Sequence, residues 1–196
     1  MIETRKRPVG VAIWLIVSGI IGWYAAFALT IEKFEKLENP DSIASCDISP
    51  LVQCSTNLNS WQGSVFGFPN PLIGIAAWVA PIVVGFAILA GARFARWFWT
   101  FFWLGYVFAI GFVFWLVFQS IFALNVLCPW CMVTWLMVIP SFFVVTFTAM
   151  KQGAFGSGGI ALGERLMGWT PVFAVVVLAI IAVLAETRLH VLTTLF

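Results

Sequence analysis

The stretch from Cys128 to Met150, CPWCMVTWLMVIPSFFVVTFTAM, decides the fold of this chain. It contains no charged residue, and it is long enough to cross the hydrocarbon core of a bilayer, which takes about 20 residues of helix. Because lipid offers no hydrogen-bond partners to backbone groups, an apolar segment of this length is a helix. The stretch therefore predicts a transmembrane helix that begins at a pair of cysteines.

Four further segments have the same character. They are Val9–Ile31, Pro71–Gly91, Trp97–Asn125 and Trp169–Glu186. The expected fold is an all-α integral membrane protein with a single membrane domain over residues 1–196. We expect a four-helix transmembrane bundle plus a fifth transmembrane helix, with a long outer loop over residues 32–70 between the first two helices.

The composition of the chain excludes most other classes of protein. Of the 196 residues, 62% are hydrophobic and 9% are charged, whereas a soluble domain has about 25% charged residues. The 20 Phe and 11 Trp residues suit lipid-facing surfaces and interfacial belts. With a net charge of only +2, the chain is not expected to bind nucleic acid, and its expected surroundings are membrane lipid.

The N-terminal segment also has features of a signal peptide. Arg5-Lys6-Arg7 precedes an apolar run that ends near Ala26-Phe27-Ala28. The run from Val9 to Ala28 exceeds the 7–15 residues that are usual for the apolar region of a signal peptide. We therefore expect it to remain as the first membrane helix.

The positions of the cations predict the topology by the positive-inside rule. If the N-terminus is cytoplasmic, seven of the ten Lys and Arg residues face the cytoplasm. Those expected inside are Arg5, Lys6, Arg7, Arg93, Arg96, Lys151 and Arg165, and those expected outside are Lys33, Lys36 and Arg188. The prediction is a multi-pass protein of the plasma (inner) membrane, with all four cysteines on the outer (periplasmic) side, where disulfides persist.

The outer loop carries the first cysteine pair, Cys46 and Cys54. Before it, apolar residues at a spacing of three, Ile31, Phe34 and Leu37, indicate a helical extension or a short amphipathic segment on the membrane surface. Ser49-Pro50 predicts a turn that lets the two cysteines approach disulfide distance. From this pair alone, a structural disulfide that staples the loop is a full alternative to a redox role.

The second pair, Cys128 and Cys131, forms a CxxC motif. Pro129 is a favoured first helical residue, so Cys128 is expected at a helix N-terminus, where the dipole and free N–H groups favour a thiolate. Cysteines one helical turn apart suit thiol–disulfide exchange. Two alternatives are inert buried cysteines and a zinc site, but the spacing of the two pairs lacks the paired CxxC motifs of structural zinc sites, so no metal is expected.

A redox-active dithiol needs an electron acceptor. The glycine-rich stretch Gly153–Gly163 follows a membrane helix rather than a strand, so it is not a dinucleotide-binding fingerprint. The single histidine, His190, offers no paired haem ligation. A lipid-soluble quinone in an apolar pocket is the acceptor that best suits a helix bundle.

These motifs resemble the vitamin K epoxide reductase family, specifically its bacterial disulfide-forming members. The resemblance covers about Val9–Met150 and rests on the loop pair, on a serine and glycine segment, on an Asn-Pro helix start and on CPWC at the fourth helix. The residues that carry it are Cys46, Cys54, Ser60, Gly63, Asn70, Cys128 and Cys131. The DsbB-like oxidases have the two pairs in the opposite order.

The resemblance implies a role for each of these residues. Cys131 would face the quinone, of the ubiquinone or menaquinone (vitamin K) type, Cys128 would exchange with Cys54 through a transient disulfide, and Cys46 would meet the external dithiol. Ser60 and Asn70 would either hydrogen-bond quinone oxygens or shape the loop. Trp135 belongs to the same expected pocket, and it stands where vertebrate members have tyrosine, so a hydrogen bond is lost there.

The expected function is that of a quinone-dependent thiol–disulfide oxidoreductase, which oxidises a partner and supports disulfide formation in exported proteins. Many bacterial members carry a fused thioredoxin-like domain, but this sequence ends at Phe196, so a separate thioredoxin-like (DsbA-like) protein on the outer side is the expected partner. Two alternatives remain open at this point: a reductase of vitamin K quinone or its epoxide, and a non-enzymatic membrane scaffold with a structural loop disulfide.

Overall fold

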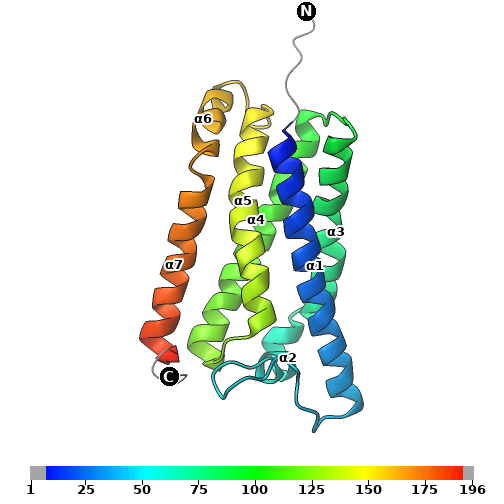
Figure 1. The fold of residues 1–196 in the computed structure, drawn as a ribbon, viewed down its shortest axis with the longest axis vertical. Coiled ribbons are helices and arrows are strands. Elements are labelled where there is room, and N and C mark those ends of the chain that lie inside the picture. The colour runs from blue at the N-terminus through cyan, green and yellow to red at the C-terminus, as the bar shows by residue number, and fades with distance from the viewer. Residues whose placement is uncertain (1–7, 192–196) are drawn as a thin grey trace, which may run out of the picture.

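The computed structural model describes residues 8–191, and it is helical throughout apart from loops and one isolated β-bridge within that range. Five long helices run along the same axis (Figure 1). They are α1 (Val9–Glu38), α3 (Asn70–Leu89), α4 (Arg96–Phe118), α5 (Pro129–Lys151) and α7 (Thr170–Leu189). The short elements are α2 (Ser55–Asn59), the 3-10 helix η1 (Trp61–Ser64), the π-helix η2 (Gln119–Leu124) and α6 (Gly158–Met167).

Each of the five long helices is long and apolar enough to cross a membrane, with η2 counted as the continuation of α4. Their outward faces carry large apolar side chains, such as Ile13 on α1, Phe86 on α3 and Val175 on α7, all more than half exposed to the surroundings of the bundle. Such exposure suits contact with lipid rather than with water. The predicted class, an all-α multi-pass membrane protein, is confirmed.

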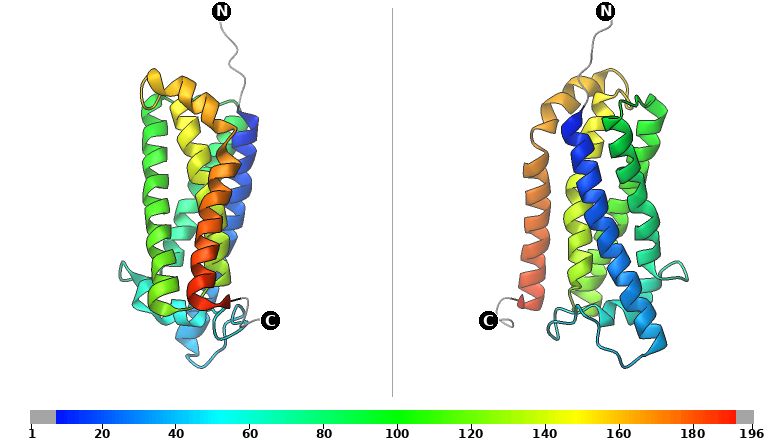
Figure 2. Two further views of the ribbon diagram at one scale, coloured as in Figure 1. Left: turned by 90° about the vertical axis from the view of Figure 1, so that its left-hand side faces the viewer. Right: turned by 45° about the vertical axis from the view of Figure 1, so that its right-hand side comes forward.

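Four of the long helices pack together, and the fifth, α7, packs on one side of them, where its residues Ile181 and Ala185 join the core. Helix α1 contacts α3 and α5, and α4 contacts α5, so α5 is central to the arrangement. Helix α7 packs on α5 and on η2 at one side of the bundle (Figures 1 and 2). The expected bundle of four helices with a fifth beside it is the arrangement observed.

Close approach of α1 and α3 depends on glycine. A Cβ atom added to Gly22 would lie 2.1 Å from the indole of Trp78, and one added to Gly85 would lie 2.7 Å from the carbonyl oxygen of Ala12. Small residues let membrane helices approach closely enough for dense van der Waals packing. This contact fixes the position of Trp78, which lines the cavity described below.

The observed helix ends differ from the predicted ones at the cysteine end of the bundle. Helix α1 runs on to Glu38, so the first part of the expected outer loop 32–70 is a helical extension, one of its two predicted forms. Helix α4 ends in a π-helical turn, after which Asn125 adopts a left-handed conformation with φ of 55°. Pro129 is the first residue of α5, as predicted from its preference for that position.

Different loops and short helices lie at the two ends of the bundle. The loop with α2 and the start of α5 lie at one end, and the start of α1, the α3–α4 connection and α6 lie at the other (Figure 1). Both cysteine pairs therefore lie at the same end, which direct exchange between them requires. The cations Arg5, Lys6 and Arg7 used in the topology prediction lie outside the described residues.

Candidate functional site

Cys46 and Cys54 form a disulfide, with their Cα atoms 5.7 Å apart. The chain between them reverses at the predicted turn, where the N–H of Ile48 donates to the carbonyl of Val52 at 2.9 Å. The N–H of Val52 in turn donates to the hydroxyl and to the carbonyl oxygen of Ser49, both at 3.1 Å. The local turn thus brings the two cysteines to bonding distance.

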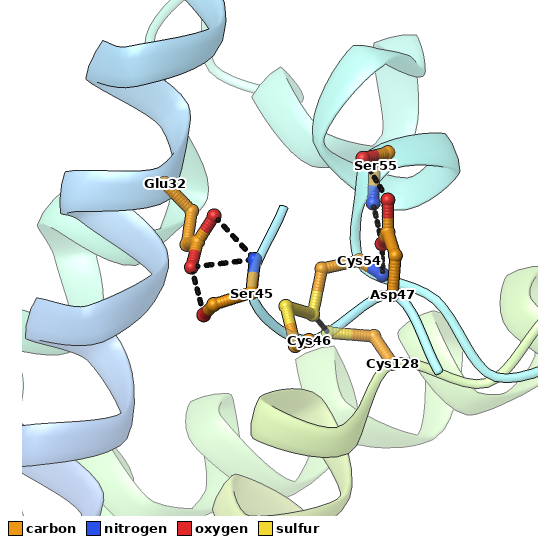
Figure 3. Close-up of a disulfide and its surroundings, with 7 residues drawn as sticks. All are labelled: Glu32, Ser45, Cys46, Asp47, Cys54, Ser55 and Cys128. Atoms are coloured by element: carbon orange, nitrogen blue, oxygen red, sulfur yellow. Dashed lines mark hydrogen bonds between the residues drawn. A yellow bond between two sulfur atoms is a disulfide. The ribbon is translucent and has the colours of Figure 1, made fainter. Parts of the chain in front are cut away.

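Asp47 ties the first cysteine of the pair to the second. Its carboxylate accepts hydrogen bonds from the N–H of Cys54 at 2.7 Å, from the N–H of Ser55 at 3.0 Å and from the Ser55 hydroxyl (Figure 3). Burial opposes ionisation of Asp47, but these hydrogen bonds outweigh it, and the pKa of the carboxyl lies below its ordinary value. The carboxylate also occupies the N-terminus of α2, where a negative charge is favoured.

The other side of the loop is held by the extension of α1. The carboxylate of Glu32, which is 7% exposed, accepts hydrogen bonds from the N–H and hydroxyl of Ser45, the residue before Cys46 (Figure 3). One residue later, the ammonium of Lys33 donates to the carbonyl of Leu58 at 2.6 Å. The helical extension of α1 thus fastens both flanks of the disulfide.

A short backbone pairing connects the loop to the segment before α5. Val52 and Leu127 form an isolated parallel β-bridge. The N–H of Gln53 donates to the carbonyl of Leu127 at 2.9 Å, and the N–H of Leu127 donates to the carbonyl of Leu51 at 2.8 Å. No sequence pattern predicts this pairing, which aligns Cys54 with Cys128.

The result is a direct contact between the two cysteine pairs. The thiol of Cys128 lies 3.3 Å from the sulfur of Cys54, and neither side chain is exposed (Figure 3). Cys128 is the N-cap of α5 and Cys131 lies one turn into the helix. Both are free thiols. A thiolate at the Cys128 position is favoured by the helix N-terminus and can attack Cys54, with Cys46 as the leaving group.

Cys128 and Cys131 also line a cavity in the bundle, which has a volume of about 510 Å³. The cavity lies between α1, α3, α4, α5 and the loop, and its lining is mostly apolar and aromatic. Residues that define it are Ala26, Ile73, Trp78, Phe112, Val113, Cys131, Trp135 and Val138. A cavity of this size and character suits a small apolar ring system with few polar contacts.

The predicted pocket residues take different positions around this cavity. Trp135 is buried and lines it. Asn70 lines it too, but its carboxamide holds the loop: Oδ1 accepts from the N–H of Val65 at 3.1 Å, and Nδ2 donates to the carbonyl of Gln62 at 2.6 Å. The Ser60 hydroxyl caps η1 by accepting from the N–H of Gly63 at 3.3 Å, and it donates to the carbonyl of Asn57 at 2.7 Å. Both polar side chains therefore shape the loop.

Sequence reasoning missed the polar atoms that do remain available in the cavity wall. Among the described residues, the buried atoms without a hydrogen-bond partner are Nδ2 of Asn57, Oε1 of Gln62 and the hydroxyl oxygen of Tyr106. All three residues line the cavity. In the described part of the chain, no group of three or more His, Cys, Asp or Glu side chains is arranged to hold a metal ion.

Taken together, the fold and the site define a polytopic membrane protein whose two cysteine pairs are arranged for thiol–disulfide exchange beside an apolar cavity. The chain belongs to the Vitamin K epoxide reductase family, whose sequence profile matches residues 13–146. That range includes all four cysteines and the cavity. No curated protein and no solved structure matches the chain. Membership confirms the family resemblance seen in the sequence and assigns the chain to thiol–disulfide oxidoreductases.

Proposed function

We propose that this protein oxidises the dithiol of a separate thioredoxin-like (DsbA-like) partner and passes the electrons to a quinone of the ubiquinone or menaquinone type. The observation that carries the proposal is the contact of 3.3 Å between Cys54 and Cys128, beside a cavity that Cys131 lines. This contact supports one continuous path from the loop disulfide to the cavity.

The exchange chemistry uses only the four cysteines. A partner thiolate attacks Cys46, Cys54 leaves as a thiolate, and the second partner thiol completes the partner's disulfide. The Cys54 thiolate then attacks Cys128 of an oxidised Cys128–Cys131 pair, Cys131 leaves as a thiolate, and Cys46 displaces Cys128 to restore the loop disulfide. The products are the loop disulfide and two thiols at the CxxC, the state that the structure holds.

The cavity supports a quinone as the acceptor for the CxxC thiols. Its lining is apolar, it reaches Cys131, and it contains unpartnered polar atoms of Asn57 and Gln62. When bound there, a quinone supplies an acceptor for two electrons and two protons, which it takes as two thiols become a disulfide. Trp135 and Trp78 are buried and line the same cavity as these thiols.

The distribution of cations supports the proposed orientation, with the cysteine end outside the plasma (inner) membrane. Four of the described cations lie at the opposite end of the bundle: Arg93 and Arg96 at the α3–α4 connection, Lys151 at the end of α5 and Arg165 in α6. The cysteine end carries Lys33, Lys36 and Arg188. Positive residues favour the cytoplasmic side, which leaves the cysteines in the oxidising compartment.

The proposal is tested with purified protein, a short-chain quinone and a reduced thioredoxin-like partner. The wild-type protein is expected to consume quinone, and the Cys131→Ala variant is not. Leu136→Ala, a change on the lipid-exposed face of the same helix, is the matched control and should retain the rate. Full activity of Cys131→Ala would contradict the proposed electron path.

Two alternatives give different results in the same assay. A reductase of vitamin K quinone or epoxide would turn over vitamin K epoxide at the expense of a dithiol, so the epoxide is assayed beside the quinone. A non-enzymatic scaffold would form no mixed disulfide with the partner and would consume no quinone, and loss of Cys46 would lower only its stability.

A further inference from the structure

Two loop residues that line the cavity, Asn57 and Gln62, each carry a buried polar atom without a hydrogen-bond partner. Gln62 is 7% exposed, and its Oε1 has no hydrogen-bond partner. Nδ2 of Asn57 is likewise buried without a partner. Burying a polar group without a hydrogen bond costs free energy, so such atoms in a cavity wall indicate where a ligand supplies the missing bond.

The loop holds both residues firmly in place. Asn70 fixes the backbone of Gln62 through a hydrogen bond of 2.6 Å to its carbonyl oxygen. Gly63 packs so closely on α2 that an added Cβ atom would lie 2.4 Å from the carbonyl oxygen of Asn57. Leu58, which follows Asn57, packs in one cluster with Cys54 and Cys128, and Cys131 contacts this cluster. The backbone of both residues is therefore held in place, and Asn57 directly precedes a residue that packs with Cys54 and Cys128.

A third carboxamide, that of Gln119, contacts Gln62. Nε2 of Gln62 donates to Oε1 of Gln119, the first residue of η2, at 3.3 Å. Nε2 of Gln62 is engaged in this way, whereas its Oε1 has no hydrogen-bond partner. The loop's part of the cavity wall thus carries one unpartnered donor, on Asn57, and one unpartnered acceptor, on Gln62.

A donor and an acceptor together match a hydroxyl group rather than a carbonyl group. A quinone carbonyl oxygen accepts from Asn57 but leaves the Gln62 oxygen unpaired, because a quinone has no O–H group. A hydroquinone hydroxyl both accepts and donates, so the reduced ring satisfies both side chains. The two ring forms differ because only the hydroquinone has O–H donors. The difference holds whether the two side chains contact one ring oxygen or two.

We propose that Asn57 and Gln62 hold the ring oxygens of the ligand and that, with Gln119 orienting Gln62, they bind the hydroquinone form more tightly than the quinone form. The inference rests on the proposed function. Preferential binding of the reduced ring shifts the equilibrium toward the Cys128–Cys131 disulfide, by the factor that separates the two affinities. Asn57 and Gln62 therefore favour electron flow out of the thiols.

The test measures binding rather than turnover. Trp78 and Trp135 line the cavity, so quenching of tryptophan fluorescence reports ligand entry. A short-chain ubiquinone and its hydroquinone are titrated under anaerobic conditions into the full chain with Cys131→Ser, which prevents oxidation of the CxxC pair. We expect the hydroquinone to bind about three- to tenfold more tightly, the difference that one net hydrogen bond makes.

Variants separate the two side chains. Gln62→Met should remove the preference by weakening hydroquinone binding alone, whereas Asn57→Leu should weaken both forms, since both accept from its N–H. Gln119→Met frees the orientation of Gln62 and should reduce the preference, while Gln119→Glu, an obligate acceptor, should retain it. The matched controls Gln53→Met and Asn59→Leu change residues of the same loop that lie outside the cavity wall, and neither should alter binding.

The outcomes distinguish this inference from the proposed function. Equal affinity of the wild-type cavity for both ring forms, or an equal loss of both forms in Gln62→Met, overturns the inference and leaves the proposed acceptor intact. Absence of quenching by either form overturns the proposed acceptor and this inference with it. If Gln62→Met fails to fold, the two Gln119 variants decide, because they leave every residue of the cavity wall unchanged.

Discussion

The thiol of Cys128 lies 3.3 Å from the sulfur of Cys54, within a cluster that excludes solvent from both. Cys54 is also bonded to Cys46, so its sulfur belongs to the loop disulfide and contacts the first thiol of the CxxC. A thiolate attacks the disulfide sulfur that it can reach, and the other sulfur leaves. The contact therefore supports the proposed order of exchange, in which Cys46 reacts with the partner and Cys131 faces the cavity.

The first prediction concerns this contact between Cys54 and Cys128. A Cys46→Ser/Cys131→Ser double variant retains only the two cysteines that are already in contact. Mild oxidation should convert it almost completely to a Cys54–Cys128 disulfide, because little movement is needed to bring the sulfurs to bonding distance. Peptide mass spectrometry after alkylation of the remaining thiols measures the yield. The matched Cys54→Ser/Cys131→Ser variant should form a Cys46–Cys128 bond far more slowly, and equal rates would contradict the assigned order.

The second prediction concerns the hold of α1 on the loop. Glu32→Ala removes the acceptor for the N–H and hydroxyl of Ser45, so the chain before Cys46 gains freedom. Because Cys46 is 6% exposed in the intact loop, we expect dithiothreitol to reduce the loop disulfide several times faster in this variant. Glu35→Ala removes an exposed carboxylate on the same helix and should leave the reduction rate unchanged. The same slow rate in both variants would show that another contact closes the loop.

The third prediction is a dependence of stability on pH that comes from Asp47. Its pKa is lowered in the folded protein, so its contribution is full above the ordinary carboxyl pKa of about 3.9. As the pH falls below that value, the unfolded chain binds the proton first, and the contribution is lost as the pH passes through the lowered folded pKa. The melting temperature of the wild-type protein should therefore fall as the pH is lowered from about 5 to about 3.

Asp47→Asn isolates this contribution. It weakens the capping of α2 and should cost about 1 kcal/mol of folding free energy at neutral pH. The variant should also show a smaller decline in melting temperature on acidification, so that the two proteins converge at low pH. Asp41→Asn changes an exposed carboxylate of the same loop and should follow the wild-type curve. Parallel curves for the wild-type protein and Asp47→Asn would contradict the assignment.

The helices and the approach of the two loop cysteines could be predicted because each depends on local sequence. An uncharged stretch such as Cys128–Met150 has only one stable form in lipid, and Ser49-Pro50 makes the turn that joins Cys46 to Cys54. The Val52–Leu127 bridge could not be predicted, since it joins distant segments through backbone atoms that every residue has. Cys54 and Cys128 are 74 residues apart, and only the family resemblance paired them.

The polar side of the cavity shows why site residues are harder to predict than helices. Ser60 and Asn70 have the functional groups to contact a ligand, but whether those groups are available depends on the backbone around them. In the structure both side chains form hydrogen bonds with the loop backbone, whereas Gln62 and Asn57 each have a side-chain atom without a partner. Residue type indicates what a side chain can do, whereas availability is a property of the folded loop.

The fourth prediction concerns the packing that shapes the cavity. Gly22→Ala places a Cβ atom 2.1 Å from the Trp78 indole, so α1 and α3 must separate or Trp78 must move into the cavity that it lines. Overpacking of this kind should cost about 2 kcal/mol and lower the melting temperature in detergent. Gly111→Ala, at a position on α4 with nothing within 4 Å of an added Cβ, should have little effect. Because Trp78 borders the ligand cavity, Gly22→Ala should weaken the binding of both ring forms equally, and unchanged binding would mean that the helices, rather than the indole, absorb the extra volume.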